Sequence, residues 1–218
     1  MSEVKLIAYT QSKEIAGITS QDIMAYCARV SNPSNQNNSE TAEKLLNYCV
    51  RNKHWSVFEM CNVVIEINTT RDIARQILRH RSFHFQEFSQ RYANPNELGF
   101  ETREFRLQDT KNRQNSIEVD EDNEMTRSWK LKQDQLIHET KLAYKWAIEN
   151  GIAKEQARAV LPEGLTMSRM YMNGTVRDWI HYCKLRMGPE TQKEHRVVAK
   201  KCWDVLVKVY PFLETLEM

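Results

Sequence analysis

The sequence is poor in the residues that build nucleotide-binding turns and disulfide frameworks. Only six glycines and five prolines occur in 218 residues, and they form neither a G-x-G-x-x-G turn nor a P-loop. A bound nucleotide must therefore be held by side chains. The five cysteines are odd in number, far apart and never in a C-x-x-C pair, which is typical of reduced thiols in a cytosol.

Long apolar runs and a strong charge imbalance are also missing. No stretch approaches the about 20 apolar residues of a membrane span, and the first residues include no basic segment followed by an apolar run. We therefore expect a soluble, cytoplasmic protein. The 31 basic and 29 acidic side chains leave a formal net charge of +2, which argues against a general electrostatic role on nucleic acid or on membranes.

Motifs for metal and hydrolytic chemistry are absent as well. The six histidines form no H-E-x-x-H pair, so no metal site is expected. No G-x-S-x-G elbow surrounds a serine, so a Ser-His-Asp hydrolase is unsupported. Cys183 lies on the apolar side of its expected helix, which suits a packed thiol better than a nucleophile.

The apolar pattern predicts dispersed strands among more numerous helices. We expect strands over 4–9, 62–68, 101–107 and 166–172, an extended segment over 83–92 and an acidic loop over 118–124. We expect helices that begin at Ser20, Ser39, Asn68-Thr69-Thr70 and Thr175, helices over 124–150 and 190–209, and a short helix that carries Arg158 and ends at Pro162. These elements predict an α+β fold with a mostly antiparallel sheet in a single domain, residues 1–218.

The most informative stretch is residues 71–92. Arg71, Arg75 and Arg79 recur at intervals of four, so they stack on one face of a helix whose opposite side carries Ile73 and Ile77. Like charges at that spacing repel by about 0.2 to 0.5 kcal/mol per pair, so an anion is expected beside them. One interpretation is a solvated basic face with partners on neighbouring loops. The other is a ligand site, because the hydroxyls, acid and phenylalanines that follow suit a phosphate and a ring system.

The same stretch carries a family resemblance. Arg79-His80-Arg81, with Ser89 and Arg91, resembles the R-H-R-x7-S signature of flavin-dependent thymidylate synthases. The similarity extends over nearly the whole chain. Further matching segments are Ala28-Arg29-Val30-Ser31, His54 to Glu59 (similar to H-x-T-P-F-E, with Ser56 keeping the hydroxyl), Arg158 in an A-R-x-x-L-P segment and Arg186 in a late L-R segment. Where many family members have two asparagines, this chain has Thr175 and His181.

The resemblance implies a homotetramer that binds FAD, takes hydride from NADPH and moves the methylene of methylenetetrahydrofolate to C5 of dUMP, which gives dTMP and tetrahydrofolate. It implies that Arg186 is catalytic, because it would lie against the uracil and favour ionisation at N3. The implied dUMP ligands are Gln76, Arg79, Glu87, Ser89, Arg91, Arg158 and Arg186. The implied FAD ligands are Ser56, Arg79, His80, Arg81, Glu87, Thr175, Arg177 and His181.

A second class of function stays open on the residues alone. In a non-catalytic nucleotide- or RNA-binding module, the arginine helix would contact phosphates and Phe83, Phe85 and Phe88 would stack on bases. The near-neutral net charge argues against this interpretation. Nothing near Ser89 in the sequence is an obvious base, so we interpret Ser89 as a substrate ligand rather than a nucleophile.

Overall fold

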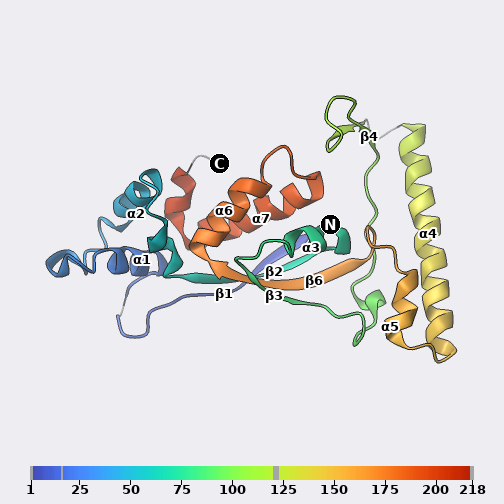
Figure 1. The fold of residues 1–218 in the computed structure, drawn as a ribbon, viewed down its shortest axis with the longest axis horizontal. Helices are drawn as coiled ribbons and strands as arrows, with labels where there is room; N and C mark the ends of the chain where they lie inside the picture. The colour runs from blue at the N-terminus through green and yellow to red at the C-terminus, as the bar shows by residue number, and fades with distance from the viewer. Residues whose placement is uncertain (1, 16, 120–122, 217–218) are drawn as a thin grey trace. The chain divides into compact units, whose positions relative to one another are not determined.

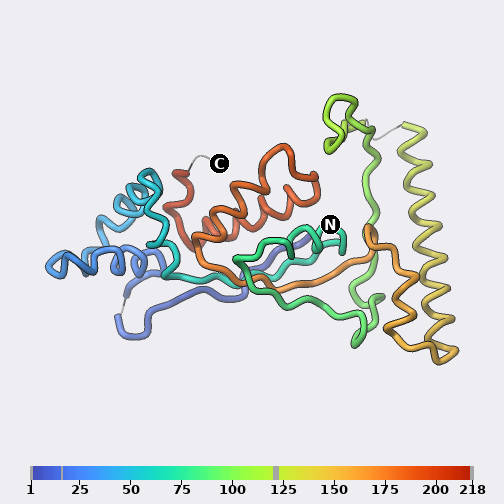
Figure 2. Tube along the Cα trace, viewed as in Figure 1, coloured from blue at the N-terminus to red at the C-terminus, as the bar shows by residue number. Residues whose placement is uncertain are grey.

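The computed structural model describes residues 2–15, 17–119 and 123–216. The chain divides into two compact units, and each unit is built from three stretches that are separate in the sequence. Unit 1 holds Met1–Ser2, Asn68–Arg79 and Glu87–Met170, and unit 2 holds Glu3–Ile67, His80–Gln86 and Tyr171–Met218. Figure 2 traces the path of the chain through these segments.

The elements follow one another in a mixed order (Figure 1). They are β1 (Glu3–Tyr9), α1 (Ser20–Ala28), α2 (Ala42–Arg51), β2 (Asn62–Thr70), α3 (Arg71–Ile77), β3 (His84–Glu87), β4 (Arg106–Gln108), β5 (Ser116–Glu118), α4 (Glu124–Glu149), α5 (Lys154–Ala157), β6 (Met167–Thr175), α6 (Val176–Arg186) and α7 (Lys193–Val209). The main sheet has the antiparallel strand order β1-β2-β6-β3, and β4 pairs with β5 so that Arg106 lies opposite Glu118. The expected α+β class with a mostly antiparallel sheet is therefore confirmed.

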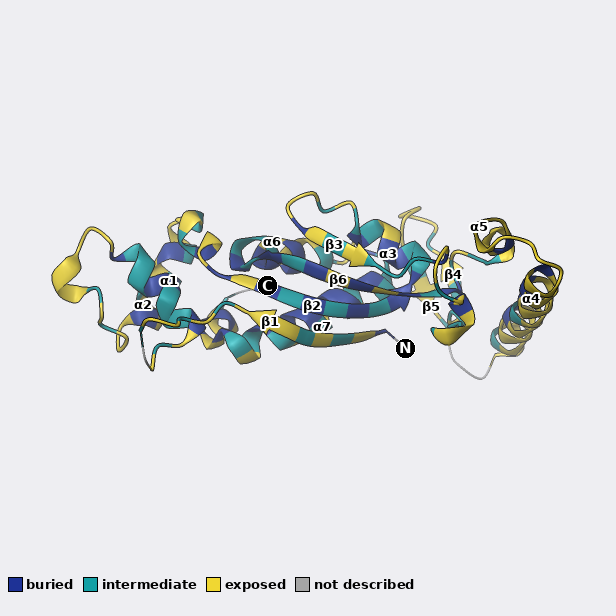
Figure 3. Cartoon of the chain, turned by 90° about the horizontal axis from the view of Figure 1, so that it is seen from below, coloured by how far each residue is buried: buried dark blue, intermediate teal, exposed yellow. Residues whose placement is uncertain are grey.

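Unit 2 has its core between the sheet and two helices. Helix α7 contacts both α6 and β1, and Figure 3 shows the strands in front of these helices. Trp179 of α6 is fully buried and its indole Nε1 donates a hydrogen bond to the Val63 carbonyl oxygen at 3.1 Å. Cys183 is buried, its thiol donates to the Ala199 carbonyl oxygen at 3.7 Å, and burial raises the pKa of that thiol well above its usual value. The interpretation of Cys183 as a packed thiol is thus confirmed.

Four helices of unit 2 can be compared with the residues at which the sequence predicted them to begin. Thr175 caps α6 in a capping box with Asp178, as expected. The cap of α1 is Thr19 rather than Ser20, because the Thr19 hydroxyl and the Asp22 carboxylate bind the first turn reciprocally. Helix α2 begins at Ala42 after Thr41, not at Ser39, and α7 begins at Lys193, three residues later than expected.

Unit 1 contains the arginine helix, α3, which follows β2 directly and buries Ile73 and Ile77 as expected. The strand expected over 101–107 is wrong, because only Arg106–Gln108 is a strand. Upstream, the backbone of Arg103 bonds to a side chain instead of a ladder: its N–H donates to Gln133 Oε1 at 2.7 Å and its carbonyl accepts from Gln133 Nε2 at 2.9 Å. Part of the acidic loop, residues 120–122, lies outside the described residues.

The long helix of unit 1, α4, is confirmed, and much of its apolar surface is exposed. The side chains that α4 buries are Gln133, Thr140, Tyr144 and Ala147. Met125, Trp129 and Leu136 are instead 58%, 43% and 50% exposed. An apolar row left open on one chain is typical of a surface that another chain covers.

Two further expectations concern the whole chain. All five cysteines are free. Within the described ranges, no helix combines the length and the apolar character that crossing a membrane requires.

Candidate active site

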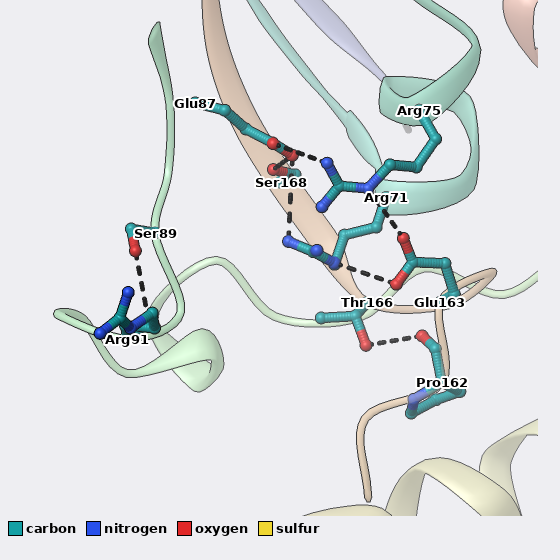
Figure 4. Close-up of polar contacts among 9 residues, drawn as sticks. All are labelled: Arg71, Arg75, Glu87, Ser89, Arg91, Pro162, Glu163, Thr166 and Ser168. Carbon is teal, nitrogen blue, oxygen red and sulfur yellow. Dashed lines mark hydrogen bonds and ion pairs between the residues drawn. The ribbon is translucent and has the colours of Figure 1, made fainter. Parts of the chain in front are cut away.

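In unit 1 the first two arginines of α3 meet two carboxylates (Figure 4). Arg71 Nε lies 3.1 Å from Glu163 Oε2, and Arg75 Nε lies 3.2 Å from Glu163 Oε1. Arg75 Nη1 also lies 3.2 Å from Glu87 Oε2, and Arg71 Nη1 lies 3.9 Å from the other oxygen of Glu87. For Arg71 and Arg75, partners on neighbouring segments therefore supply the expected negative charge.

Backbone and side-chain hydrogen bonds hold both carboxylates. The N–H groups of Arg71 and Asp72 donate to the carbonyls of Thr166 and Glu163 at 3.0 and 3.2 Å, which fastens the Glu163 segment to the first turn of α3. Burial alone raises the pKa of Glu163, but the hydrogen bonds and charges of Arg71 and Arg75 outweigh burial and hold that pKa below its ordinary value. Ser168 of β6 donates its hydroxyl to Glu87 Oε1 at 2.9 Å.

The other predicted ligands of unit 1 are differently placed. Arg79 and Arg158 are exposed, and neither forms an ion pair with any residue that the structure describes. Arg91 pairs with Glu155 at 3.3 Å, although both side chains are more than half exposed. The Ser89 hydroxyl accepts a hydrogen bond from the Arg91 N–H at 3.4 Å. Gln76 is half-buried on α3.

Sequence reasoning missed several residues that shape this part of the molecule. Arg103 donates to Asp72 Oδ1 at 2.7 Å and to the Thr70 hydroxyl, so it fixes the start of α3 from about thirty positions away in the chain. Ser168 is also distant in sequence from its partner Glu87. Glu163 had a signal, since it directly follows the Arg158 to Pro162 segment that had been singled out.

In unit 2 one group of predicted ligands surrounds the start of α6. Arg177 forms an ion pair with Glu59 of the 3-10 turn Trp55–Glu59, and the exposed Ser56 lies on that same turn. The indole of Trp55 lies 4.6 Å from the His181 ring, centroid to centroid. Partial burial and then the Arg177 charge lower the pKa of His181. The Thr175 hydroxyl donates to Asp178 Oδ2 at 2.6 Å within the capping box.

A second group of unit 2 lies at the end of α6. Arg186 Nε donates to His80 Nε2 at 2.8 Å. The His80 ring stands edge-on to Tyr182, with centroids 4.9 Å apart and planes 83° apart. The Tyr182 hydroxyl lies 3.1 Å from Nε2 of the fully buried His195. Neither Tyr182 nor His195 was predicted as part of a site.

The chemistry of unit 2 fits a flavin. Arg81 is exposed and has no carboxylate partner within the described segments, so its guanidinium is available to a phosphate. The Trp55 and His181 rings supply flat surfaces, and Ser56 supplies a hydroxyl. The Asn173 Oδ1 is buried and has no hydrogen-bond partner in the described structure, so a ligand N–H would satisfy it.

Comparison with known proteins places the chain in a family. Residues 5–212 match the family described as "Thymidylate synthase complementing protein". The chain is 47% identical to a probable flavin-dependent thymidylate synthase of Paramecium bursaria Chlorella virus 1 over 95% of its own length and 94% of the relative. It is 45% identical to the flavin-dependent thymidylate synthase of Synechocystis sp., with 96% of each chain covered.

A solved structure shows the same fold. It is the UMP/dUMP methylase PolB from Streptomyces cacaoi bound with 5-Br dUMP, with a TM-score of 0.78, 22% identity, and coverage of 97% of this chain and 92% of that one. The two relatives at 47% and 45% identity define a class of flavin-dependent enzymes. The chain belongs to the flavin-dependent thymidylate synthase family. Membership confirms that it is an enzyme and that its cofactor is a flavin, FAD.

Proposed function

We propose that the protein catalyses the reductive methylation of dUMP to dTMP, with methylenetetrahydrofolate as carbon donor and NADPH as hydride source. The relatives from the virus and from Synechocystis are named thymidylate synthases, and PolB is named a UMP/dUMP methylase. The bound flavin would supply the redox chemistry, and this chain's residues would bind, orient and polarise the substrates.

The observation that carries the proposal is a division among the arginines. Arg71 and Arg75 are matched by Glu87 and Glu163, so they need no ligand. Among the arginines predicted as ligands, four form no ion pair with any described carboxylate: Arg79, Arg81, Arg158 and Arg186. Guanidinium groups whose charge no carboxylate neutralises, and whose N–H donors stay available, are suited to bind a phosphate or a developing oxyanion.

The proposed dUMP site follows in part from this division. Arg79 and Arg158, which have no carboxylate partner among the described residues, would bind the phosphate. Arg91 would join them from its solvent-exposed ion pair with Glu155, with Gln76, Glu87 and Ser89 as the further ligands that the resemblance assigns. Ser89 suits a ligand rather than a nucleophile, because the only hydrogen bond seen for its hydroxyl in the described structure is accepted from a backbone N–H. Arg186 would stabilise negative charge that develops on the uracil when N3 ionises, which activates the ring without a covalent bond to cysteine.

The proposed FAD site draws on the residues that the resemblance assigns. They are Ser56, Arg79, His80, Arg81, Glu87, Thr175, Arg177 and His181. Arg177 is already oriented by Glu59, whereas the Thr175 hydroxyl is engaged by Asp178. We therefore expect Arg81 and Arg177 to contribute more to flavin affinity than Thr175.

We further propose that the chain acts as one functional domain, forms a homotetramer and works in the cytoplasm. The exposed apolar residues of α4 support self-association, because isolated domains rarely leave such rows open. They are Met125, Trp129, Leu131, Leu136, Leu142 and Trp146. The five free cysteines are compatible with a reducing compartment.

The RNA-binding alternative loses its stacking surface. Phe83 is 5% exposed, and its ring packs edge-on to Trp179 with centroids 4.9 Å apart. Phe85 and Phe88 are only half-exposed. No observation favours this function over dUMP methylation.

A dTMP-formation assay tests the proposal. Purified protein is supplied with dUMP, methylenetetrahydrofolate and NADPH, with and without FAD, and dTMP is quantified. We expect FAD-dependent dTMP, turnover lost in Arg186→Ala with flavin retained, and a raised KM for dUMP in Arg91→Ala. Arg51→Ala is the matched control, because Arg51 is an exposed arginine of α2 that bonds only to the Asn47 carbonyl among the described residues. Absence of dTMP in every mixture would refute the proposed reaction.

A further inference from the structure

We propose that His80 is a positioning residue for Arg186, which it orients through a neutral ring and therefore without cancelling the arginine's charge. The inference rests on the proposed function, in which Arg186 acts on the uracil. It adds a second role for the His80 side chain to the flavin contact proposed above.

The direction of the hydrogen bond fixes the state of the His80 ring. Arginine has only donors, so the 2.8 Å contact requires His80 Nε2 to be the acceptor. A histidine that accepts at Nε2 must be neutral and must carry its proton on Nδ1. The bond occupies the Arg186 Nε–H and leaves the two terminal nitrogens of the guanidinium for a substrate.

Packing holds the His80 ring in this orientation. Its edge meets Tyr182 at 4.9 Å and Phe83 at 6.4 Å between centroids, with planes 83° and 87° apart. Phe83 cannot move toward Gly174, because even a Cβ on that glycine would lie 2.5 Å from the Phe83 ring. The contact between the Tyr182 hydroxyl and His195 Nε2 ties Tyr182 to α7. His80 is therefore backed by buried groups on two helices.

Charge explains why a histidine suits this position. Arg186 faces His80, Tyr182 and His195, and it forms no ion pair with a carboxylate in the described chain. Burial and the Arg186 charge lower the pKa of His80 to about 4, and burial lowers the pKa of His195 to about 3. Burial also raises the pKa of Tyr182. At neutral pH Arg186 is thus the single charge of the group, and its positive charge remains available to the substrate.

Three substitutions separate positioning from other roles. His80→Gln places an amide oxygen within reach of the Nε2 position and keeps a neutral acceptor. His80→Glu keeps an acceptor of the same length but adds a negative charge, and His80→Leu removes the acceptor. We expect kcat within a few-fold of wild type for Gln. For Leu we expect kcat about 10- to 100-fold lower, as the loss of one hydrogen bond to a charged group implies. For Glu we expect a similar fall for a different reason, because its carboxylate would neutralise the charge of Arg186. KM for dUMP and the flavin content should change much less than kcat.

Control variants and coupling sharpen the test. His138→Gln, His138→Glu and His138→Leu alter an exposed histidine of α4 and should leave kcat unchanged. On the residual rate of Arg186→Ala, measured at high enzyme concentration, His80→Leu should have no further effect, because the two residues act as one unit. Equal kcat for Gln and Glu, full activity for Leu, or a loss of FAD affinity that accounts for the lost rate would overturn the proposal.

A spectroscopic arm does not depend on the reaction. Protein labelled with [15N]histidine, with His80 assigned from its missing signals in His80→Gln, should show Nδ1 protonated and Nε2 unprotonated at pH 7. Arg186→Ala should raise the pKa of His80 toward 6.5. A protonated Nε2, or a His80 titration that Arg186→Ala leaves unchanged, would contradict the positioning role. If the wild-type enzyme makes no dTMP, the proposed function is refuted. The [15N]histidine measurements then test by themselves whether His80 accepts a hydrogen bond from Arg186.

Discussion

Replacing Glu163 by Gln is the sharpest test of the claim that carboxylates neutralise Arg71 and Arg75 and leave the other arginines to bind ligands. The carboxylate of Glu163 accepts from Nε of Arg71 and from Nε of Arg75, one on each oxygen. The amide of Gln has the same size but only one acceptor and no charge, so one of the two arginines loses its hydrogen bond. Glu87 alone would then face both guanidinium groups.

The size of the effect follows from exposure. Glu163 and Arg75 are 50% and 46% exposed, so their ion pair is screened and contributes about 0.2 to 1 kcal/mol. Arg71 is only 12% exposed, so its charged hydrogen bond contributes nearer to about 1.5 kcal/mol. Renewed repulsion between the two arginines adds about 0.2 to 0.5 kcal/mol. Because Gln keeps one bond, we expect a total loss of about 1 to 2 kcal/mol.

Thermal unfolding measures this loss. For a protein of 218 residues, 1 kcal/mol corresponds to about 2 to 4 °C, so Tm should fall by about 2 to 8 °C at pH 7. Glu149→Gln is the matched control, because it breaks the exposed 3.6 Å pair with Lys145, and its effect should stay within about 0.5 kcal/mol. High salt should reduce the difference between the two variants.

The pH dependence provides the refuting result. The pKa of Glu163 is lower in the folded protein than in the unfolded chain, so its contribution is present above the unfolded value of 4.5 and is lost as pH falls through the folded value. Glu163→Gln should therefore converge with wild type in acid. If Glu163→Gln behaves like Glu149→Gln at pH 7, then Glu163 does not neutralise Arg71 and Arg75, and the division of the arginines fails.

Three further predictions follow from other parts of the molecule. His195 is neutral when folded, with a pKa of about 3, and takes up a proton below 6.5 when unfolded. Its own contribution to stability should therefore fall by about 2 kcal/mol between pH 7.5 and 5 in urea unfolding, in addition to a fall from His80, whose pKa is about 4, and a flat profile would contradict this. Gly174→Ala should lower the free energy of unfolding by about 1 to 3 kcal/mol, because its Cβ would lie 2.5 Å from the Phe83 ring, whereas Gly164→Ala meets no atom within 4 Å and should be tolerated. The double variant Trp129→Glu, Leu136→Glu should reduce the mass measured by light scattering below that of four chains, while Lys145→Glu should not, and an unchanged mass would exclude α4 from the interface.

The sequence was sufficient where local patterns decide the structure. The alternation of Val63, Ile65 and Ile67 predicted β2, and Thr175 predicted the start of α6, because strand burial and capping depend on neighbours in the chain. The strand expected over 101–107 failed for a non-local reason: the amide of Gln133, thirty residues away, binds the backbone of Arg103. No periodicity in either segment contains that contact.

The candidate site divides in the same way. The spacing of Arg71, Arg75 and Arg79 predicted a shared face and a need for negative charge, but not which arginines carboxylates would neutralise. That depended on Glu163, which lies 92 positions from Arg71. Likewise, the resemblance pointed to Arg186 and His80 separately, whereas their hydrogen bond spans 106 positions and appeared only in the folded chain.

The most direct test of the central claim is equilibrium binding of dUMP and of deoxyuridine to the flavin-loaded protein by calorimetry. If the arginines without carboxylate partners bind the phosphate, dUMP should bind on the order of 100-fold more tightly than deoxyuridine, and Arg158→Ala should remove much of that preference while Arg51→Ala should not. Equal affinity for dUMP and deoxyuridine, or a preference that Arg79→Ala and Arg158→Ala leave intact, would contradict the account.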